Sequence, residues 1–311
     1  MKKVSFKVSR RSAGLRLDLA IAASDEKLSR RKAKQIIDMG GTYVNKKRVR
    51  IASRVVEEGD LVEFNYDAKA FSQAHLDVPL TQDDILYDDE DVVVINKPPN
   101  LLTQATRSQA VYHVTSALDK LTGQKRNWLL VHRLDQETSG VLLVAKNKKS
   151  CAFLTEEIKS RSMEKEYLAL CHGVPAWKEH TEECNLSAIS PAGTVRVLAR
   201  GGKHSLTHFK VLGVNKKLGV SLILCKPVTG RSHQLRVHLA KNNLGILGDK
   251  KYGDKKANLP NEVTELTAKH HLLHAYKVGI RLSEDGKVSR LKAAPPPNFQ
   301  ALMDICGFSL I

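Results

Sequence analysis

Two apolar runs flank a short polar segment near the middle of the chain. The first run ends at Val131 and the second begins at Val141. Two buried strands joined by a tight polar turn are typical of this pattern, which predicts a strand over Leu129–Asp135. Asp135 would then stand where a rigid strand passes into a loop. Arg133 lies two residues earlier, so on a strand both side chains would share one face.

The position of Asp135 allows two interpretations, one catalytic and one structural. A carboxylate held on a rigid element beside a cation is a candidate nucleophile or base. A turn aspartate that accepts hydrogen bonds from its own backbone is the alternative, because such residues are frequent in turns. The pattern of apolar runs alone leaves both readings open.

Charge restricts the class of partner. The chain has 311 residues and a net charge of +17, which allows one large domain or two and indicates a polyanionic partner, most often nucleic acid. No apolar stretch reaches the length of a transmembrane helix, and the N-terminus lacks a signal-peptide core, so we expect no membrane association.

Cysteine and histidine spacing argues against a metal centre. The five cysteines are scattered without a Cys-x-x-Cys pair, as in reduced cytoplasmic proteins. His270, His271 and His274 could be drawn as a metal cluster, but we expect them to be ordinary strand histidines. No glycine-rich nucleotide loop is present, so we expect no cofactor and no metal.

The charge pattern divides the chain into three parts. Residues 1–66 carry a net charge of +8, residues 67–94 carry −7, and residues 95–311 carry +16. Two basic modules joined by an acidic connector explain this distribution. We therefore predict domains at 1–66 and 84–311, with an acidic linker over 67–83.

The first module contains a readable helix. Ser29 is a plausible N-cap and Gly40 a plausible stop, and the apolar residues between them follow helical spacing. The order of its short motifs resembles the S4-like (alpha-L) RNA-binding domain over residues ~10–66. That resemblance implies that the helix and the following turn bind structured RNA through Arg30, Arg31, Lys34, Lys46 and Lys47.

Apolar runs typical of strands predominate in the second module. The predicted strands, besides Leu129–Asp135, are Val92–Asn96, Val141–Lys146, Lys165–His172, Leu206–Val214, Val220–Lys226 and Leu272–Leu282. The predicted helices are Ala152–Lys159 and Gln234–Lys241. Runs of strands with inserted helices predict an α+β fold with a mixed, mostly antiparallel sheet.

Several strings in this module share one resemblance. His-Arg-Leu-Asp followed by Thr-Ser-Gly, within residues 131–140, resembles the catalytic motif of the RluA family of pseudouridine synthases. Further matching strings follow in the family's order: Asn96–Pro99, Lys165–Ala169, Thr229–Leu239, Leu247–Gly253 and Leu273–Tyr276. The resemblance covers residues ~84–300 and implies an enzyme that isomerises uridine in RNA.

The resemblance implies roles for five residues. Asp135, Tyr167 and Arg231 would be catalytic, with Asp135 as nucleophile or base and Arg231 as its ion-pair partner; the alternative for Arg231 is that it caps a helix or binds phosphate. Tyr167 would stack on uracil, and Leu235 would pack against the base. Arg133 would enter the RNA helix where the uridine has left it, or hold a phosphate. Attack on C6, attack on C1′ and base catalysis through a glycal all remain open for Asp135.

Some positions depart from the family's usual pattern, and alternatives remain. Pro99-Asn100 and Thr103-Gln104 replace the usual Ala-Gly and His-Pro, and Ser232 replaces threonine. We expect large-subunit (23S) ribosomal RNA as the target of a cytoplasmic monomer. A transfer-RNA pseudouridine synthase and a non-catalytic RNA-binding ribosome-assembly factor are the alternatives. An aspartyl-nucleophile hydrolase or phosphotransferase fits less well, because the surroundings of Asp135 are cationic.

Overall fold

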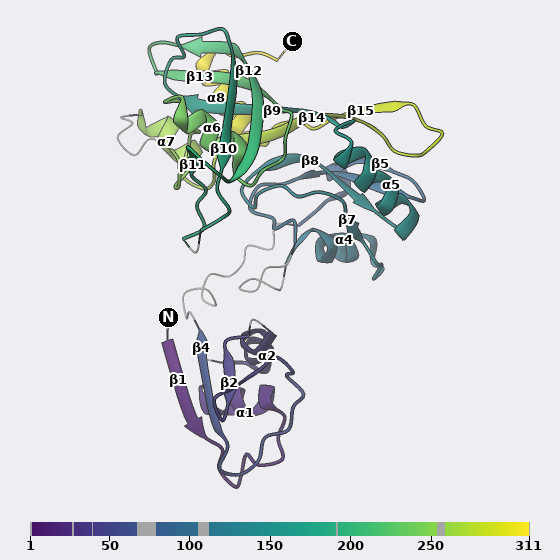
Figure 1. Ribbon diagram of the computed structural model, residues 1–311, viewed down its shortest axis with the longest axis vertical. Helices are drawn as coiled ribbons and strands as arrows, with labels where there is room; N and C mark the ends of the chain where they lie inside the picture. Colours follow the sequence, from purple (N-terminus) through teal and green to yellow (C-terminus); the bar gives the residue numbers. More distant parts are fainter. Residues whose placement is uncertain are drawn as a thin grey trace. The chain divides into compact units, whose positions relative to one another are not determined.

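The computed structural model describes residues 2–26, 28–38, 40–66, 79–104, 112–190, 192–253 and 259–310. The chain divides into two compact units (Figure 1). Described residues up to 66 belong to the first unit, and those of 79–104 and 114–310 belong to the second. The predicted linker lies mostly outside the described residues, so its limits stay a prediction.

The first unit packs two helices on a four-stranded sheet. Its elements are β1 Lys2–Lys7, α1 Leu17–Ser24, α2 Arg30–Asp38, β2 Thr42–Val44, β3 Lys47–Val49 and β4 Leu61–Tyr66. The strands pair antiparallel in the order β1-β4-β2-β3. The predicted helix after Ser29 is confirmed, and the Lys32 N–H donates to the Ser29 hydroxyl at 3.3 Å. Its apolar stripe, which includes Ile36 and Ile37, is fully buried.

The described part of the second unit forms one 11-stranded sheet, preceded by a short 3-10 helix, η1 Gln82–Asp84. Its strands are β5 Ile85–Asp88, β6 Val92–Lys97, β7 Leu129–Leu130, β8 Ser139–Ala145, β9 Glu164–His172, β10 Glu179–Leu186, β11 Val197–Leu198, β12 Lys203–Asn215, β13 Val220–Pro227, β14 Leu273–Arg281 and β15 Val288–Lys292. The main order is β11-β10-β12-β13-β9-β14-β8-β6-β5. All of the strand pairs are antiparallel except β8 with β14, which confirms the predicted fold class.

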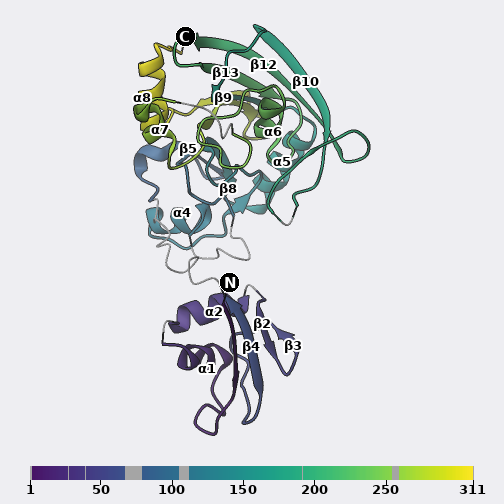
Figure 2. The same ribbon diagram turned by 90° about the vertical axis from the view of Figure 1, so that its left-hand side faces the viewer.

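Helices cover both faces of this sheet. They are α4 Val114–Thr122, α5 Lys148–Lys159, α6 Gln234–Lys241, α7 Asn261–Thr267 and α8 Pro297–Cys306. Along β9, Leu168 and Leu170 pack with α7 and α8, whereas Ala169 and Cys171 pack with α6. This alternation places α6 on the opposite face from α7 and α8 (Figure 2).

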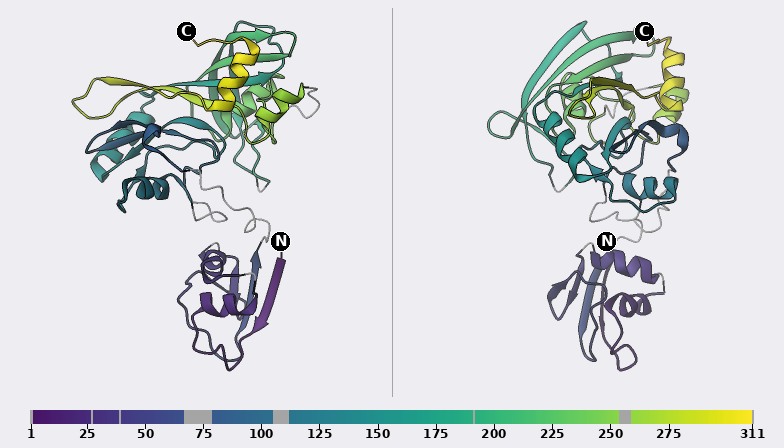
Figure 3. Two further views of the ribbon diagram at one scale, coloured as in Figure 1. Left: turned by 180° about the vertical axis from the view of Figure 1, so that it is seen from behind. Right: turned by 90° about the vertical axis from the view of Figure 1, so that its right-hand side faces the viewer.

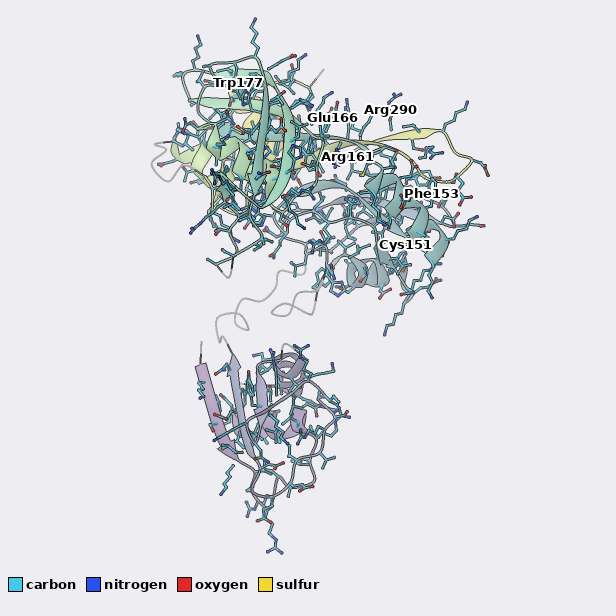
Figure 4. The ribbon with its side chains drawn as sticks, viewed as in Figure 1. Cys151, Phe153, Arg161, Glu166, Trp177 and Arg290 are labelled. Carbon is cyan, nitrogen blue, oxygen red and sulfur yellow. The ribbon has the colours of Figure 1, made fainter. Side chains whose placement is uncertain are left out.

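The other half of the sheet has its own core. Val92 and Val94 of β6, with Val141 and Leu143 of β8, pack against α5. Figure 4 shows Cys151 and Phe153 on this helix. Beyond the core, β14 and β15 continue as a two-stranded ribbon (Figure 3).

Gly140 lies where the two halves of the sheet meet. Its φ is +109°, in the region that favours glycine, and it pairs with Ala275 across the parallel β8–β14 contact. A Cβ atom at Gly140 would lie 2.2 Å from the Ala275 carbonyl oxygen. The close approach of these two backbones therefore requires glycine in the Thr-Ser-Gly string.

We expect Gly140→Ala to lower the free energy of unfolding by at least ~2 kcal/mol, because the methyl group meets backbone and the φ is strained. Gly123→Ala is the matched control. Gly123 also has a left-handed φ (+65°), but nothing lies within 4 Å of its Cβ position. Urea denaturation of both variants measures the difference, and equal losses would show that the close approach does not matter.

Candidate active site

Asp135 lies in a loop rather than on a strand. Strand β7 ends at Leu130, so the predicted strand over Leu129–Asp135 is wrong beyond that residue. The reason is that the backbone of Leu134 pairs with a side chain instead of a strand. The Thr103 hydroxyl donates to the Leu134 carbonyl at 2.7 Å and accepts from the Leu134 N–H at 3.2 Å.

A buried lysine, Lys97, holds the loop of Asp135 through hydrogen bonds to backbone carbonyls. Lys97, at the end of β6, is fully buried, and its ammonium donates to the carbonyls of Pro98, Leu101 and Gln136 at 2.9, 2.9 and 3.0 Å. Burial lowers the pKa of Lys97 to about 7, although the charge of Asp135 opposes the shift. Lys97 therefore ties the Asn-Lys-Pro segment to the residue that follows Asp135.

Arg236 is the ion-pair partner of Asp135. Its Nη1 donates to Asp135 Oδ2 at 3.0 Å, while Nε and Nη2 donate to the Asp249 carboxylate at 2.6 and 2.8 Å. Burial disfavours the Arg236 charge, but the hydrogen bonds and charges of the two carboxylates outweigh it and raise the pKa of Arg236. The Asp135 side chain is 31% exposed, so the loop presents one carboxylate to solvent with a buried cation behind it.

The predicted pairing of Arg231 with Asp135 is wrong. Arg231 precedes α6, and its Nε donates to the His204 carbonyl at 2.9 Å. Its backbone N–H donates to the Gln234 side chain, which turns the chain into the helix. Arg236 lies inside the helix, on the side that meets Asp135. The sequence could have predicted a role for Arg236, because an arginine in a helix of buried side chains needs a carboxylate partner.

Tyr167 and Leu235 belong to one apolar cluster, and Tyr167 lies near the Asp135 carboxylate. Leu235 is 7% exposed and belongs to the apolar cluster against which Tyr167 packs. Burial, with the nearby Asp135 and Cys225, raises the pKa of Tyr167 above its usual value, so the ring stays a neutral phenol. Among the described residues, no hydrogen bond reaches the Tyr167 hydroxyl. The predicted roles of both residues toward a base stay predictions.

Arg133 is exposed, one residue from the buried Leu134. In the first unit, Lys34 of α2 is exposed, and so are Lys46 and Lys47 at the β2–β3 turn. Arg30 is also exposed, but its Nε donates to the buried Asp18 carboxylate at 3.3 Å. The side chain of Arg31 lies outside the described part. The RNA-binding roles of these residues stay predictions.

Besides Arg236, two more site residues were not predicted. Asp249 holds Arg236, as described above. His233 lies just before α6 with a φ of +54°, and its Nε2 is 3.9 Å from Asp135 Oδ2. Both belong to strings that match the family, but neither had a role assigned, because single-residue types do not reveal which partners the fold brings together.

Two histidines support the loop and the strand after it: His274 is fully buried and His132 is partly buried. The Ala293 carbonyl accepts from His274 Nε2 at 3.1 Å, so His274 Nδ1 accepts from the Ser139 hydroxyl at 2.9 Å. His132 Nε2 accepts the Leu143 N–H at 3.0 Å. Burial lowers the pKa of each histidine to about 4, with the Lys165 charge adding to the shift at His132. Both rings are therefore neutral near pH 7.

The arrangement suits attack on an electrophilic carbon. A carboxylate is held at a loop by a buried cation, and a neutral aromatic ring lies beside it. Such a carboxylate can act as a nucleophile or accept a proton. Among the described residues, no group of three or more His, Cys, Asp or Glu side chains is arranged to hold a metal ion.

Comparison with known proteins decides the family. Residues 15–62 match the S4 domain, and residues 91–241 match the RNA pseudouridylate synthase family. Ribosomal large subunit pseudouridine synthase C of Escherichia coli (strain K12) is 34% identical over 294 residues, covering 90% of this chain and 89% of the relative. The chain belongs to the RNA pseudouridine synthase family. The resemblance found in the motif strings is thus confirmed, and the chain is an enzyme of this family.

Other relatives and solved structures indicate the same family. An uncharacterized RNA pseudouridine synthase of Aquifex aeolicus is 31% identical over 296 residues, covering 92% of each chain. Among solved structures, human RNA pseudouridylate synthase domain containing 4 aligns with a TM-score of 0.60 at 25% identity, covering 73% of this chain and 94% of the other. These likenesses confirm a pseudouridine synthase fold joined to an N-terminal S4 domain.

Two further observations bear on the setting of this synthase. All five cysteines are unpaired. Within the described ranges, no helix has the length and apolar character needed to span a bilayer.

We expect the synthase to lose stability as the pH falls from 6.5 to 4. The unfolded chain takes up protons at His132 and His274 below pH 6.5, whereas the folded chain does so only near pH 4. Each histidine would lower the free energy of unfolding by up to ~1.4 kcal/mol per pH unit in this window. Urea denaturation across it should show a shallower pH dependence for His274→Gln. An unchanged slope in this variant would contradict a neutral buried His274.

We expect Arg236→Gln to reduce the rate of pseudouridine formation at least ~100-fold, because Asp135 loses its fixed cation. It should also destabilise the fold by ~3 kcal/mol, since the buried carboxylate of Asp249 loses its cation. Arg231→Gln should stay within ~3-fold of the wild-type rate. Single-turnover release of tritium from C5 of uridine in RNA measures both rates. Equal losses in the two variants would contradict the assignment of Arg236.

Proposed function

We propose that this chain converts specific uridines of large-subunit ribosomal RNA into pseudouridine, with Asp135 as the catalytic nucleophile or base. The observation that carries the proposal is the Asp135 carboxylate, which is held by Arg236 at 3.0 Å in a loop beside Tyr167. The relatives named ribosomal large subunit pseudouridine synthase C support the choice of RNA.

The reaction needs little beyond these groups. The bond between C1′ and N1 of uracil breaks, C1′ joins C5, N1 gains a proton, and the hydrogen of C5 is released. Asp135 adds to C6, adds to C1′ or removes a proton on the way to a glycal, and the three routes share the same carboxylate. No redox change occurs, so no cofactor is required.

The enzyme must also bind the target uridine and the RNA around it. The target uridine must leave its stack, which costs a few kcal/mol. Tyr167 and Leu235 offer an apolar surface for uracil, and the exposed Arg133 stands where it can fill the gap or hold a phosphate. The S4 domain binds the surrounding RNA through Arg30, Arg31, Lys34, Lys46 and Lys47, since phosphate contacts position a protein on RNA.

Location and assembly are also proposals. Five unpaired cysteines agree with a reducing compartment such as the cytoplasm. We propose that the enzyme acts there as a monomer.

The test is pseudouridine mapping of ribosomal and transfer RNA from cells that lack this protein. The cells are complemented with wild type, Asp135→Asn or Asp304→Asn. The last variant is the matched control, because Asp304 is an exposed carboxylate on α8. We expect pseudouridines of large-subunit ribosomal RNA to vanish and to return with wild type and Asp304→Asn only.

Other outcomes would contradict the proposal in different ways. Restoration by Asp135→Asn would remove Asp135 from the chemistry. Loss of pseudouridine from transfer RNA alone would overturn the proposed target. No change in any RNA would favour a binding factor for ribosome assembly.

A further inference from the structure

A tight turn over residues 248–253 lies behind the Asp135–Arg236 ion pair. The Asp249 side chain is fully buried and accepts four hydrogen bonds: two from Arg236, and two from the backbone N–H groups of Lys251 and Tyr252 at 2.9 and 3.1 Å. Burial raises the pKa of Asp249, but the Arg236 bonds and charge more than offset this, so the net shift is downward. Asp249 is thus an ionised carboxylate that organises its own turn and one guanidinium.

Asp249 sets the direction in which Arg236 donates. A guanidinium is planar and rigid, so two hydrogen bonds to one carboxylate fix its plane. With Nε and Nη2 on Asp249, the remaining nitrogen, Nη1, donates to Asp135 Oδ2. The Tyr252 ring lies against the same guanidinium, whose Cζ is 5.0 Å from the ring centre.

Tyr252 sets the direction of a second donor. Its hydroxyl oxygen accepts the Val195 N–H at 2.6 Å, and it lies 2.8 Å from His233 Nδ1. We assign the phenol proton to this contact, so that the Tyr252 hydroxyl donates to Nδ1 and a neutral His233 carries its ring proton on Nε2. That nitrogen faces Asp135 Oδ2 at 3.9 Å. The left-handed φ of His233 is the kind of backbone strain that surrounding contacts must hold in place.

We propose that Asp249 and Tyr252 are positioning residues: Asp249 directs the Arg236 hydrogen bond onto Oδ2 of Asp135, Tyr252 orients His233 Nε2 toward the same oxygen, and Oδ1 is left as the reacting atom. Within the described part of the chain, Oδ1 accepts no hydrogen bond, whereas Oδ2 faces both donors. The inference rests on the proposed function, because it takes Asp135 to be the catalytic carboxylate. It assigns a role to residues that lie behind the site and touch no substrate.

The first test compares conservative variants in the full-length enzyme on a large-subunit ribosomal RNA transcript. We expect Asp249→Asn to lower kcat about 100-fold with KM within about threefold of wild type, because misdirected groups slow the chemical step rather than binding. Tyr252→Phe, which removes only a hydroxyl, should lower kcat about tenfold. Tritium release from C5 measures both.

Two control variants match these changes elsewhere in the same unit. Glu157 is a buried carboxylate in a two-point pair with Arg281, at 2.6 and 3.3 Å. Tyr276 is a buried tyrosine whose hydroxyl has no hydrogen-bond partner among the described residues. Glu157→Gln and Tyr276→Phe should keep wild-type kcat. Thermal unfolding of all four variants identifies any that fail to fold, and Tyr252→Phe carries the test if Asp249→Asn is one of them.

A double-mutant cycle distinguishes positioning from general support of the fold. If Asp249 acts through Arg236, then Asp249→Asn should lower kcat no further in an Arg236→Gln background. Multiplying effects would overturn the proposal, and so would wild-type kcat in both Asp249→Asn and Tyr252→Phe. The Asp135→Asn variant distinguishes a failure of this inference from a failure of the proposed function. If it is inactive while the positioning variants behave like their controls, only this inference fails. A wild-type enzyme that releases no tritium, or an active Asp135→Asn, overturns the proposed function as well.

Discussion

The buried guanidinium of Arg236 is the interaction on which the site depends. A single cation inside the fold is unfavourable unless charges and hydrogen bonds compensate it, and here two carboxylates do so. One of them, Asp249, is wholly enclosed, whereas Asp135 is partly open to solvent. This asymmetry separates the two acids: the enclosed one holds the cation, and the open one is available to react.

The rest of the domain brings these groups together from distant parts of the chain. The β6 end supplies Lys97 beneath the Asp135 loop, and α6 supplies Arg236 from the face of the sheet opposite α7 and α8. The parallel contact of β8 with β14 requires Gly140, since only a residue without Cβ allows so close an approach. Rigid elements therefore carry the partners, while the reactive carboxylate itself lies in a loop.

Local patterns predicted most elements and missed others for identifiable reasons. Helix α6 and strand β13 were predicted closely, because each combines an apolar run with a clear end. Strand β10, Glu179–Leu186, was missed because its polar residues show no apolar alternation and its pairing comes from its neighbours. The strand predicted through Asp135 failed because the hydroxyl of Thr103, 31 residues before Leu134, takes the hydrogen bonds of the Leu134 backbone that a neighbouring strand would otherwise make. Thr103 is also one of the departures from the family's usual pattern.

The sequence by itself determined the family, the α+β class, the S4 domain and Asp135 as the candidate catalytic carboxylate, since these depend on short sequence motifs and on periodicity. Tertiary structure decided which arginine meets Asp135. Arg231 and Arg236 lie five residues apart in one matching string, on either side of the start of α6. Arg231, before the helix, donates to a backbone carbonyl, whereas Arg236, inside the helix, donates to two carboxylates. Partner choice among buried charges is a property of the folded chain, because the residues concerned lie up to 114 positions apart, from Asp135 to Asp249.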